Sequence, residues 1–169
     1  MKNFRFVTGL FLIALLVSCS SSRNKNQYCA NAVEMLPWVN NNVVKEVKQP
    51  DHQYAFFVDS THEYSYGFKL NVKNLNIKNP KKMTASCDGY LYKIPTSVHL
   101  VIEIRNNETC IHWVSQNFAK EKTIMADWKK VSLTTNLPKE TNENTSILVY
   151  VWSQAHEAAL IDNITVTFE

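Results

Sequence analysis

Hydrophobic and polar residues alternate along much of the chain from Tyr54 onward, and this alternation predicts β-strands. The clearest row places apolar side chains at every second position over residues 64–72, with polar or small residues between them. A second row covers residues 98–104, after which residues 106–108, Asn-Asn-Glu, turn the chain into residues 109–115. Period two is typical of a half-buried strand, so the second row and the segment after the turn are predicted to form a β-hairpin.

Further segments rich in β-branched and aromatic residues complete the set of predicted strands: residues 55–58, 83–92, 128–134, 147–152 and 160–168. Loops are predicted where asparagines, prolines and charges gather, at residues 74–82, 135–146 and 153–157. Apolar residues over 31–39 are spaced as in a helix, but Pro37 interrupts them. Many short strands in succession predict an all-β fold, an antiparallel β-sandwich.

The N-terminus has a different pattern. Lys2 and Arg5 precede an apolar stretch at residues 6–17, and Ser18-Cys19 follows it. About a dozen apolar residues is well short of the roughly 20 that span a bilayer, whereas basic residues, a short apolar segment and a small residue before the cleavage site are features of a secretory signal.

Residues 16–19, Leu-Val-Ser-Cys, resemble the lipobox of bacterial lipoproteins. This resemblance implies cleavage before Cys19 and attachment of three acyl chains to Cys19, which would anchor the protein to a membrane. It divides the chain into a lipoprotein signal peptide at residues 1–18, the lipidated cysteine with a polar tether at 19–27, and a β-sandwich domain at 28–169. The length of that last part suits a single core.

Residues 20–25, which follow Cys19, contain no acidic side chain. Surface-exposed lipoproteins of Bacteroidota usually carry acidic residues at these positions. By that resemblance we expect a lipid-anchored protein of the outer membrane whose domain faces the periplasm.

Charge and glycine content exclude two classes of partner. Cleavage after Ser18 removes Lys2 and Arg5, so the formal net charge falls from +3 to +1, and the lysines between residues 73 and 82 have no aromatic residue among them. A nucleic-acid partner is therefore not expected. The mature chain retains only Gly67 and Gly89, too few for a phosphate-binding loop, so no nucleotide is expected either.

Three motifs follow one another in the last third of the chain: Trp-Lys-Lys-Val at residues 128–131, Ile-Leu-Val-Tyr-Val-Trp at 147–152, and Leu-Ile-Asp-Asn-Ile at 160–164. In this order they are similar to the closing strands of galactose-binding-like jelly rolls, the fold of many carbohydrate-binding modules. Residues 57–65 resemble the opening of such domains in Bacteroidota lipoproteins. The resemblance covers most of residues 54–168 and implies a jelly-roll domain that binds carbohydrate.

Sugar-binding jelly rolls stack pyranose rings on exposed aromatic side chains. Tyr90, Tyr92 and Trp113 lie where strands can present them on a face, and we expect ligand binding there. Trp128 and Trp152 lie inside the strand motifs and are interpreted as core or edge packing residues, because aromatic side chains in strands usually fill the core.

Many of these jelly rolls hold a structural calcium ion near the last strand. Asp162 matches the aspartate at that position, and Asp59 and Glu63 are acidic residues in segments that can contribute further oxygen ligands. The usual second aspartate is Asn163 here, which halves the charge available to a cation. The alternative is that Asp162 caps a turn through hydrogen bonds to the local backbone.

The remaining cysteines leave their redox state open. With Cys19 lipidated, Cys29, Cys87 and Cys110 permit one disulfide and one free thiol, and Cys87 and Cys110 can equally face the core as small hydrophobic residues. For catalysis, the histidines are scattered, and no motif joins a nucleophile to a base or two carboxylates to each other. We therefore expect a protein that is not an enzyme.

Two functions remain after these exclusions. The first is a lipid-anchored, non-catalytic envelope protein that binds carbohydrate, and the second is a structural or assembly lipoprotein whose sandwich binds a protein partner at the outer membrane. An exposed row of aromatic side chains with polar neighbours would favour the glycan, and a contiguous apolar patch would favour the protein.

Overall fold

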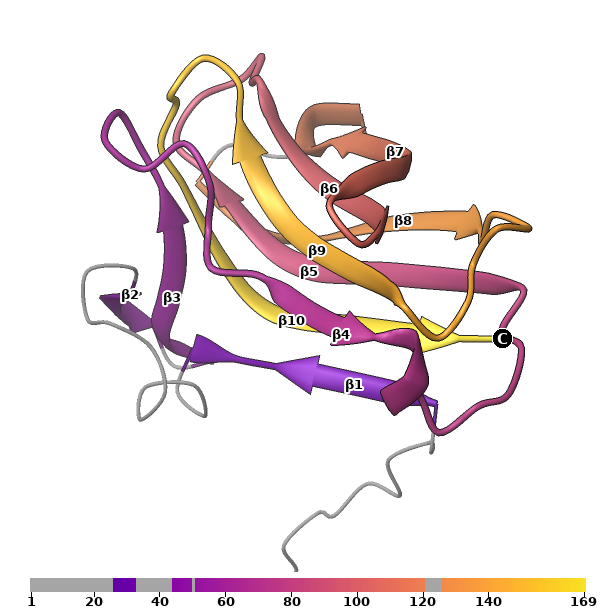
Figure 1. Cartoon of the computed structure of the whole chain (residues 1–169). Helices are drawn as coiled ribbons and strands as arrows, with labels where there is room; N and C mark the ends of the chain where they lie inside the picture. The colour runs from indigo at the N-terminus through magenta and orange to yellow at the C-terminus, as the bar shows by residue number, and fades with distance from the viewer. Residues whose placement is uncertain (1–25, 33–43, 50, 121–125) are drawn as a thin grey trace, which may run out of the picture.

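The structure is a computed structural model that describes residues 26–32, 44–49, 51–120 and 126–169. The predicted signal peptide, Cys19 and all but the first two residues of the expected helix at 31–39 lie outside these ranges. Within them, no helix has the length and apolar character that crossing a membrane requires. Two antiparallel β-sheets pack face to face, which confirms the predicted β-sandwich (Figure 1).

The larger sheet has six strands. In chain order they are β1 (Gln27–Ala30), β2 (Val44–Gln49), β3 (His52–Val58), β5 (Lys82–Leu91), β8 (Trp128–Asn136) and β10 (Ala159–Phe168). Their order in the sheet is β2-β3-β10-β5-β8, and β1 also pairs with β10. β3 pairs with the first residues of β10 and β1 with its last ones, so these two strands follow each other along one edge of β10.

The smaller sheet has four strands, β4 (Phe68–Asn71), β6 (Val98–Asn106), β7 (Thr109–Asn117) and β9 (Thr145–Ser153), in the order β4-β9-β6-β7. Strands β6 and β7 form the predicted hairpin. Two short 3-10 helices, η2 (Val72–Asn74) and η3 (Phe118–Lys120), follow β4 and β7. In Figure 1 the strands β4, β9 and β6 lie in front of the larger sheet.

The core lies between the sheets and is built by alternate residues of the long strands. In β5 and β9, every second residue is buried, and the same phase brings apolar side chains of β6 and β10 into one cluster. Burial of apolar surface of this kind is the main driving force of folding. The other half of each strand faces outward, so the alternation that forms the core also determines which side chains the protein presents to solvent.

The expected strand at residues 64–72 is shorter than predicted. Only Phe68–Asn71 form β4, and Tyr64 makes an isolated bridge to Trp152. Phe68 pairs with Val149, so the chain from 64 to 68 has one residue more than its partner segment from 149 to 152. This is a β-bulge, and such a bulge reverses the direction of the side chains beyond it.

Ser65 explains why the ladder is interrupted at this point. Its hydroxyl accepts the N–H of Val151 at 3.0 Å and donates to the carbonyl of Tyr66 at 2.9 Å, so a side chain takes part in bonds that the backbone of a regular strand would make. Tyr66 packs against Phe56 beside the core, while Tyr64 is turned away and is 53% exposed. The prediction that Tyr64 shares a face with Tyr66 is therefore wrong.

Candidate functional site

The outer face of the four-stranded sheet collects aromatic side chains. Every second residue of β9 is buried in the core, so Leu148, Tyr150 and Trp152 point outward. Glu103 of β6 pairs with Leu148 on one side and with Trp113 of β7 on the other, which places Trp113 on the same face. Three strands of one sheet thus contribute to a single outer surface.

The bulge before β4 adds Tyr64 to this surface. Tyr64 contacts Tyr150 with ring centroids 5.8 Å apart, and Trp113 contacts Trp152 at 6.0 Å, both nearly edge to face. Tyr64 is 53% exposed and Trp113 44% exposed. We call Tyr64, Tyr150, Trp152 and Trp113 the aromatic row. Val101 points to the same face of β6 and is fully buried, so side chains of this face cover it.

A pocket of about 460 Å³ lies beside the aromatic row, between β4, β6 and β9. This volume is within the range of small-molecule sites, roughly 300 to 1,000 Å³. The side chains that reach it from the outer face are aromatic, aliphatic and charged: Tyr64, Tyr150, Leu148, Lys69, Glu103 and Arg105. The pocket therefore combines a stacking surface with groups that form hydrogen bonds.

Glu103 is fixed in this pocket by two hydrogen bonds. It is 8% exposed, one carboxylate oxygen accepts the Nε–H of Arg105, and the other accepts the Tyr150 hydroxyl at 2.9 Å. Burial raises the pKa of the Tyr150 phenol to about 12, and the bond to Glu103 acts in the same direction. Tyr150 therefore remains a hydrogen-bond donor throughout the physiological range. Glu103 is the only acidic residue among the described residues that line the pocket.

The sequence-predicted ligand residues lie on two different faces. Trp113 belongs to the aromatic row, but Tyr90 lies in β5 of the six-stranded sheet, 5.1 Å from Tyr92 and 5.6 Å from Trp128 between ring centroids. Tyr92, at the end of β5, is 53% exposed. The structure thus brings Tyr90 and Tyr92 together and separates both from Trp113.

Sequence reasoning missed most of the residues on the candidate face. Trp152 was interpreted as a packing residue, but it points out of the core, and its indole N–H donates to Glu63 at 2.8 Å. Residues 147–152 are apolar on both faces of the strand, which hides the direction of Trp152 from a search for alternation. The sequence pattern also does not indicate the other residues of this face, which are Tyr64, Lys69, Glu103, Arg105 and Tyr150.

Asp162, the first of the expected calcium ligands, already has protein partners. It is 4% exposed, and one oxygen accepts the N–H groups of Ala32 at 3.0 Å and of Asn163 at 2.8 Å. Its other oxygen lies 3.0 Å from Nδ1 of His52, whose ring stacks on Trp128 with centroids 3.8 Å apart. The bond to Asn163 is the local cap considered as the alternative, and His52 contacts the second carboxylate oxygen.

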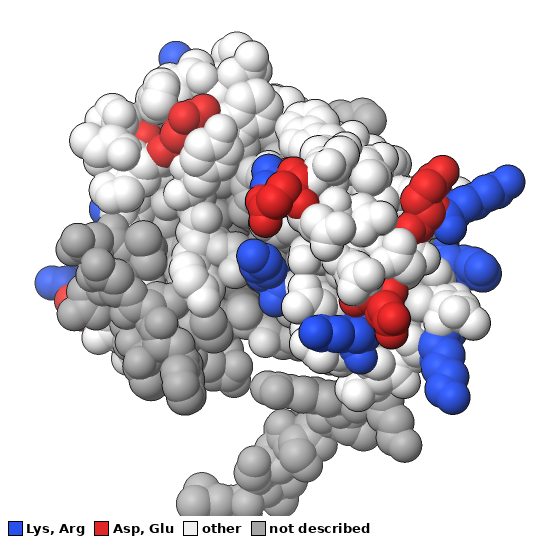
Figure 2. Space-filling model, in the orientation of Figure 1, with Lys and Arg blue, Asp and Glu red and all other residues white. Residues whose placement is uncertain are grey.

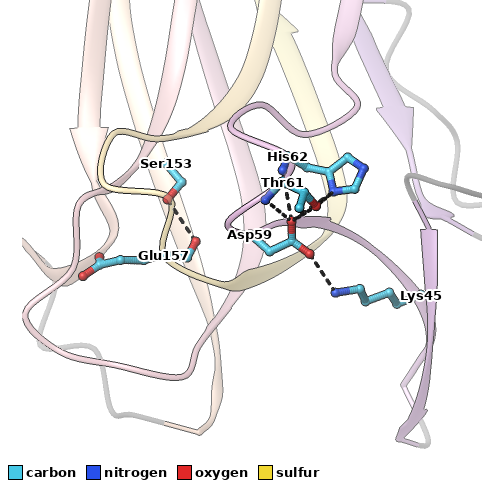
Figure 3. Close-up of polar contacts among 6 residues, drawn as sticks. All are labelled: Lys45, Asp59, Thr61, His62, Ser153 and Glu157. Carbon is cyan, nitrogen blue, oxygen red and sulfur yellow. Dashed lines mark hydrogen bonds and ion pairs between the residues drawn. The ribbon is translucent and has the colours of Figure 1, made fainter.

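Asp59 stabilises the loop between β3 and β4 (Figure 3). It does not form a common set of metal ligands with Asp162 and Glu63. One oxygen accepts the N–H groups of Thr61 and His62, both at 3.0 Å, and the other lies 3.3 Å from Nζ of Lys45. Burial raises the pKa of Asp59, but hydrogen bonds from His62, Thr61 and Lys45 outweigh this effect and hold the pKa well below its usual range. Glu63 accepts the indole N–H described above.

The three carboxylates therefore do not fit a calcium site as they are arranged. Calcium needs six to eight oxygen ligands, whereas Asp162, Asp59 and Glu63 each accept hydrogen bonds from different protein donors. Across the described ranges, no three residues of the His, Cys, Asp and Glu types gather into a group that could hold a metal ion. Calcium binding stays a prediction.

A second loop beside the Asp59 loop connects β9 to β10. The Ser153 hydroxyl donates to the Glu157 carbonyl at 2.9 Å (Figure 3), and the Glu157 carboxylate accepts the Ser97 N–H at 2.6 Å. That bond, with others from Lys93, Thr96 and the Ser97 hydroxyl, lowers the pKa of Glu157 to about 2 against the opposing effect of burial. Glu157 thereby fixes the loop that follows Trp152 to the loop that precedes β6.

The three described cysteines are free. Cys87 is fully buried in the core, and Cys29 and Cys110 are exposed. Burial raises the pKa of the Cys87 thiol. The sequence alone allows Cys87 either to pair with Cys110 or to face the core. In the structure Cys87 is a small hydrophobic core residue that is not paired with Cys110.

Charges on the visible surface alternate in sign. Figure 2 shows basic and acidic side chains beside each other, with uncharged surface between them, rather than a continuous area of one charge. Ion pairs between described residues include Lys82 with Glu169 and Lys129 with Asp127. Exposed pairs of this kind contribute little to stability but reduce the long-range field of the protein.

No protein-family model and no curated protein matches the chain. Solved structures do match. The CBM22-2 xylan-binding domain of Paenibacillus barcinonensis Xyn10C superposes with a TM-score of 0.50 at 11% identity, over 84% of this chain and 99% of that domain. The CBM22-1-GH10 modules of Clostridium thermocellum xylanase 10B, complexed with xylohexaose, give a TM-score of 0.49 at 13% identity over 86% of this chain.

The chain spans 25% of that xylanase chain and 20% of a bacteriophage CBA120 tailspike protein that it also matches. TmCBM61 in complex with β-1,4-galactotriose is a weaker match, with a TM-score of 0.42 at 14% identity over 85% of this chain and 88% of that one. The chain therefore has a jelly-roll fold like that of carbohydrate-binding modules, which confirms the fold that the sequence predicted.

Proposed function

We propose that this protein is a lipid-anchored, non-catalytic carbohydrate-binding protein, and that its binding site is the outer face of the four-stranded sheet. The observation that carries the proposal is the aromatic row, in which Tyr64 and Trp113 remain 53% and 44% exposed on one face. A pyranose ring stacks its C–H groups on such rings. Its hydroxyls then need polar partners nearby.

Polar side chains surround the aromatic row and can provide these partners. The Ser115 hydroxyl lies 3.3 Å from Nδ1 of His99, Asn117 approaches the other nitrogen of the same ring, and His99 itself contacts Trp152. The cores of protein interfaces are depleted of charged groups, whereas Glu103 lies at the centre of this face. An aromatic surface interrupted by hydrogen-bonding groups favours a glycan over a protein partner.

Two further points support the wider proposal. The fold is shared with a xylan-binding domain, and the pocket beside the aromatic row contains a single carboxylate, which suits binding rather than hydrolysis. The lipobox-like residues 16–19 support attachment to the outer membrane through Cys19, and the lack of acidic side chains at residues 20–25 supports a domain on the periplasmic side.

The test uses soluble protein of residues 20–169 on an array of plant, host and bacterial envelope glycans. We expect a specific ligand, and we expect Tyr64→Ala and Trp113→Ala each to weaken its binding about tenfold, as for aromatic residues central to an interface. Tyr92→Ala is the matched control, because Tyr92 is as exposed as Tyr64 but directly follows β5 of the other sheet. Chelation with EDTA should leave binding unchanged, since Asp162, Asp59 and Glu63 already have protein partners.

The opposite pattern would place the site elsewhere. Loss of binding in Tyr92→Ala, with Tyr64→Ala unaffected, would move the site to the six-stranded sheet. An empty array would favour a protein partner instead, to be identified by what co-purifies with the membrane-anchored form.

A further inference from the structure

We propose that the pocket beside the aromatic row selects a sugar that carries an anionic group, either a carboxylate or a sulfate. This inference rests on the proposed function and names the ligand class of the same site. It starts from the strand register. Leu148 lies between Lys69 of β4 and Glu103 of β6, and Arg105 follows two residues after Glu103, so two cations line the pocket from opposite strands.

Lys69 is available to a ligand. Its side chain is exposed, and no other residue of the described chain forms a hydrogen bond or an ion pair with its ammonium group. An unpaired lysine at the wall of a pocket provides three donors and a full positive charge.

The guanidinium group of Arg105 is held in one orientation, but its hydrogen-bonding capacity is not fully used. Its Nε–H donates to Glu103, which fixes the plane of the guanidinium group. One terminal nitrogen lies 4.0 Å from a carboxylate oxygen of Glu108, but the Glu108 side chain is wholly exposed, so solvent screens this pair. The terminal N–H groups are left to bind a planar or tetrahedral oxyanion, a geometry that arginine matches with two parallel hydrogen bonds.

Glu103 offsets only one of these two positive charges. Its two oxygens accept the Arg105 Nε–H and the Tyr150 hydroxyl, so both face protein donors. With Lys69 and Arg105 against Glu103, the lining has a formal charge of +1. Tyr64 lines the same pocket, so one sugar residue can stack on an aromatic ring and place its acidic group between the two cations.

The test compares polymers that differ only in charge. Polygalacturonate, alginate and hyaluronan are each measured beside their carboxyl-reduced neutral forms, and dextran sulfate is measured beside dextran, by affinity electrophoresis of residues 20–169. We expect an anionic polymer to bind about tenfold more tightly than its neutral form, with a preference that decreases as salt rises. The carboxylate and sulfate arms show which of the two groups is recognised.

Variants connect that preference to the pocket. Lys69→Gln removes one cation, and Arg105→Lys retains charge but removes the two parallel donors, so each should reduce the ratio of anionic to neutral binding at least about threefold. Lys48→Gln, an exposed lysine of β2 on the other sheet, controls for overall charge.

Each result either supports or overturns the inference. Equal binding of charged and neutral forms overturns it, as does a preference that survives both variants or that decreases equally in Lys48→Gln. If a neutral glycan binds and depends on Tyr64, the proposed function stands while this inference fails. If no glycan binds at all, both fail.

Discussion

The carboxylate of Glu157 joins two loops that flank the candidate face. It accepts hydrogen bonds from Ser97 and Thr96, which precede β6, while the backbone carbonyl of the same residue accepts the Ser153 hydroxyl at the end of β9. Since β6 and β9 are the two central strands of the four-stranded sheet, one residue connects their ends through its side chain and its backbone.

The lowered pKa of Glu157 predicts how stability changes with pH. The pKa is about 2 in the folded protein and 4.5 for the ordinary group, so Glu157 stabilises the fold fully above pH 4.5, and this contribution is lost as the pH falls toward 2. Glu157→Gln should therefore reduce the free energy of unfolding by about 1–3 kcal/mol at pH 7, and by progressively less below pH 4.5. Urea unfolding from pH 7 to pH 2 measures both effects.

The control for this measurement is Glu108→Gln, since the Glu108 side chain is wholly exposed. We expect it to behave like the wild-type protein at each pH. A constant difference between wild type and Glu157→Gln across the whole range would show that the contribution does not come from ionisation of Glu157.

At this scale the sequence predicts residue types better than it predicts their positions. Asp162 was identified as a residue with a special role near the last strand, but its partner His52 is 110 residues away in the chain, and nothing local indicates that the two meet. Similarly, the exposure of Trp113 depends on its register against Glu103 of the neighbouring strand. Contacts made across strands cannot be derived from the spacing within one strand.

At the scale of elements, periodicity predicts the long strands and fails where the backbone departs from it. β5, β6, β7, β8, β9 and β10 are present close to their predicted bounds. β5, β6, β9 and β10 each bury a row of apolar residues, whereas the edge strands β7 and β8 are mostly half-buried or exposed. β1 and β2 were not predicted, since β2, with the sequence Val-Lys-Glu-Val-Lys-Gln, has little apolar surface. The bulge before β4 was missed because Ser65 reads as an ordinary polar position in an alternating row.

Gly67 makes that bulge possible and provides a prediction for the element. A Cβ atom at Gly67 would collide with the Val149 carbonyl and lie 2.9 Å from Cβ of Tyr150. Gly67→Ala should reduce the free energy of unfolding by about 1–3 kcal/mol and, by displacing Tyr150, also weaken glycan binding. Thermal unfolding and affinity electrophoresis measure the two effects.

Thr109→Ala, at an exposed position of β7 in the same sheet, is the control and should change neither property. A Gly67→Ala protein with wild-type stability would mean that β9 moves away without cost, and the close approach at this position would then have no structural role.

For the molecule as a whole, the sandwich follows from composition and alternation, whereas the attachment to a membrane rests on the N-terminal pattern alone. If Cys19 is lipidated, the full-length protein expressed in a bacterial host should incorporate an alkyne-labelled fatty acid and sediment with membranes. Cys19→Ala should lose both properties. The measurement is in-gel detection of the label in membrane and soluble fractions.

Cys29→Ala is the matched control, because Cys29 is an exposed thiol close to the N-terminus of the domain. It should retain the label. Label that persists in Cys19→Ala but disappears in Cys29→Ala would place the lipid on the folded domain and remove the basis for a cleaved signal.

The pairing of β1 with β10 also has a mechanical consequence. Phe168 donates its N–H to the carbonyl of Asn26, so Asn26, the first described residue, lies beside the end of the last strand, on the sheet opposite the one with the aromatic row (Figure 1). If Cys19 is lipidated and the candidate face binds a polysaccharide, as we propose, tension between them would cross the sandwich and reach the anchor through β1. β1 pairs with β10 over only four residues, Gln27–Ala30. We therefore expect β1 to separate from β10 first under tension. Separation of β1 from β10 would lengthen the tether under tension before the glycan is released. The anchored protein would then extend before it loses its ligand.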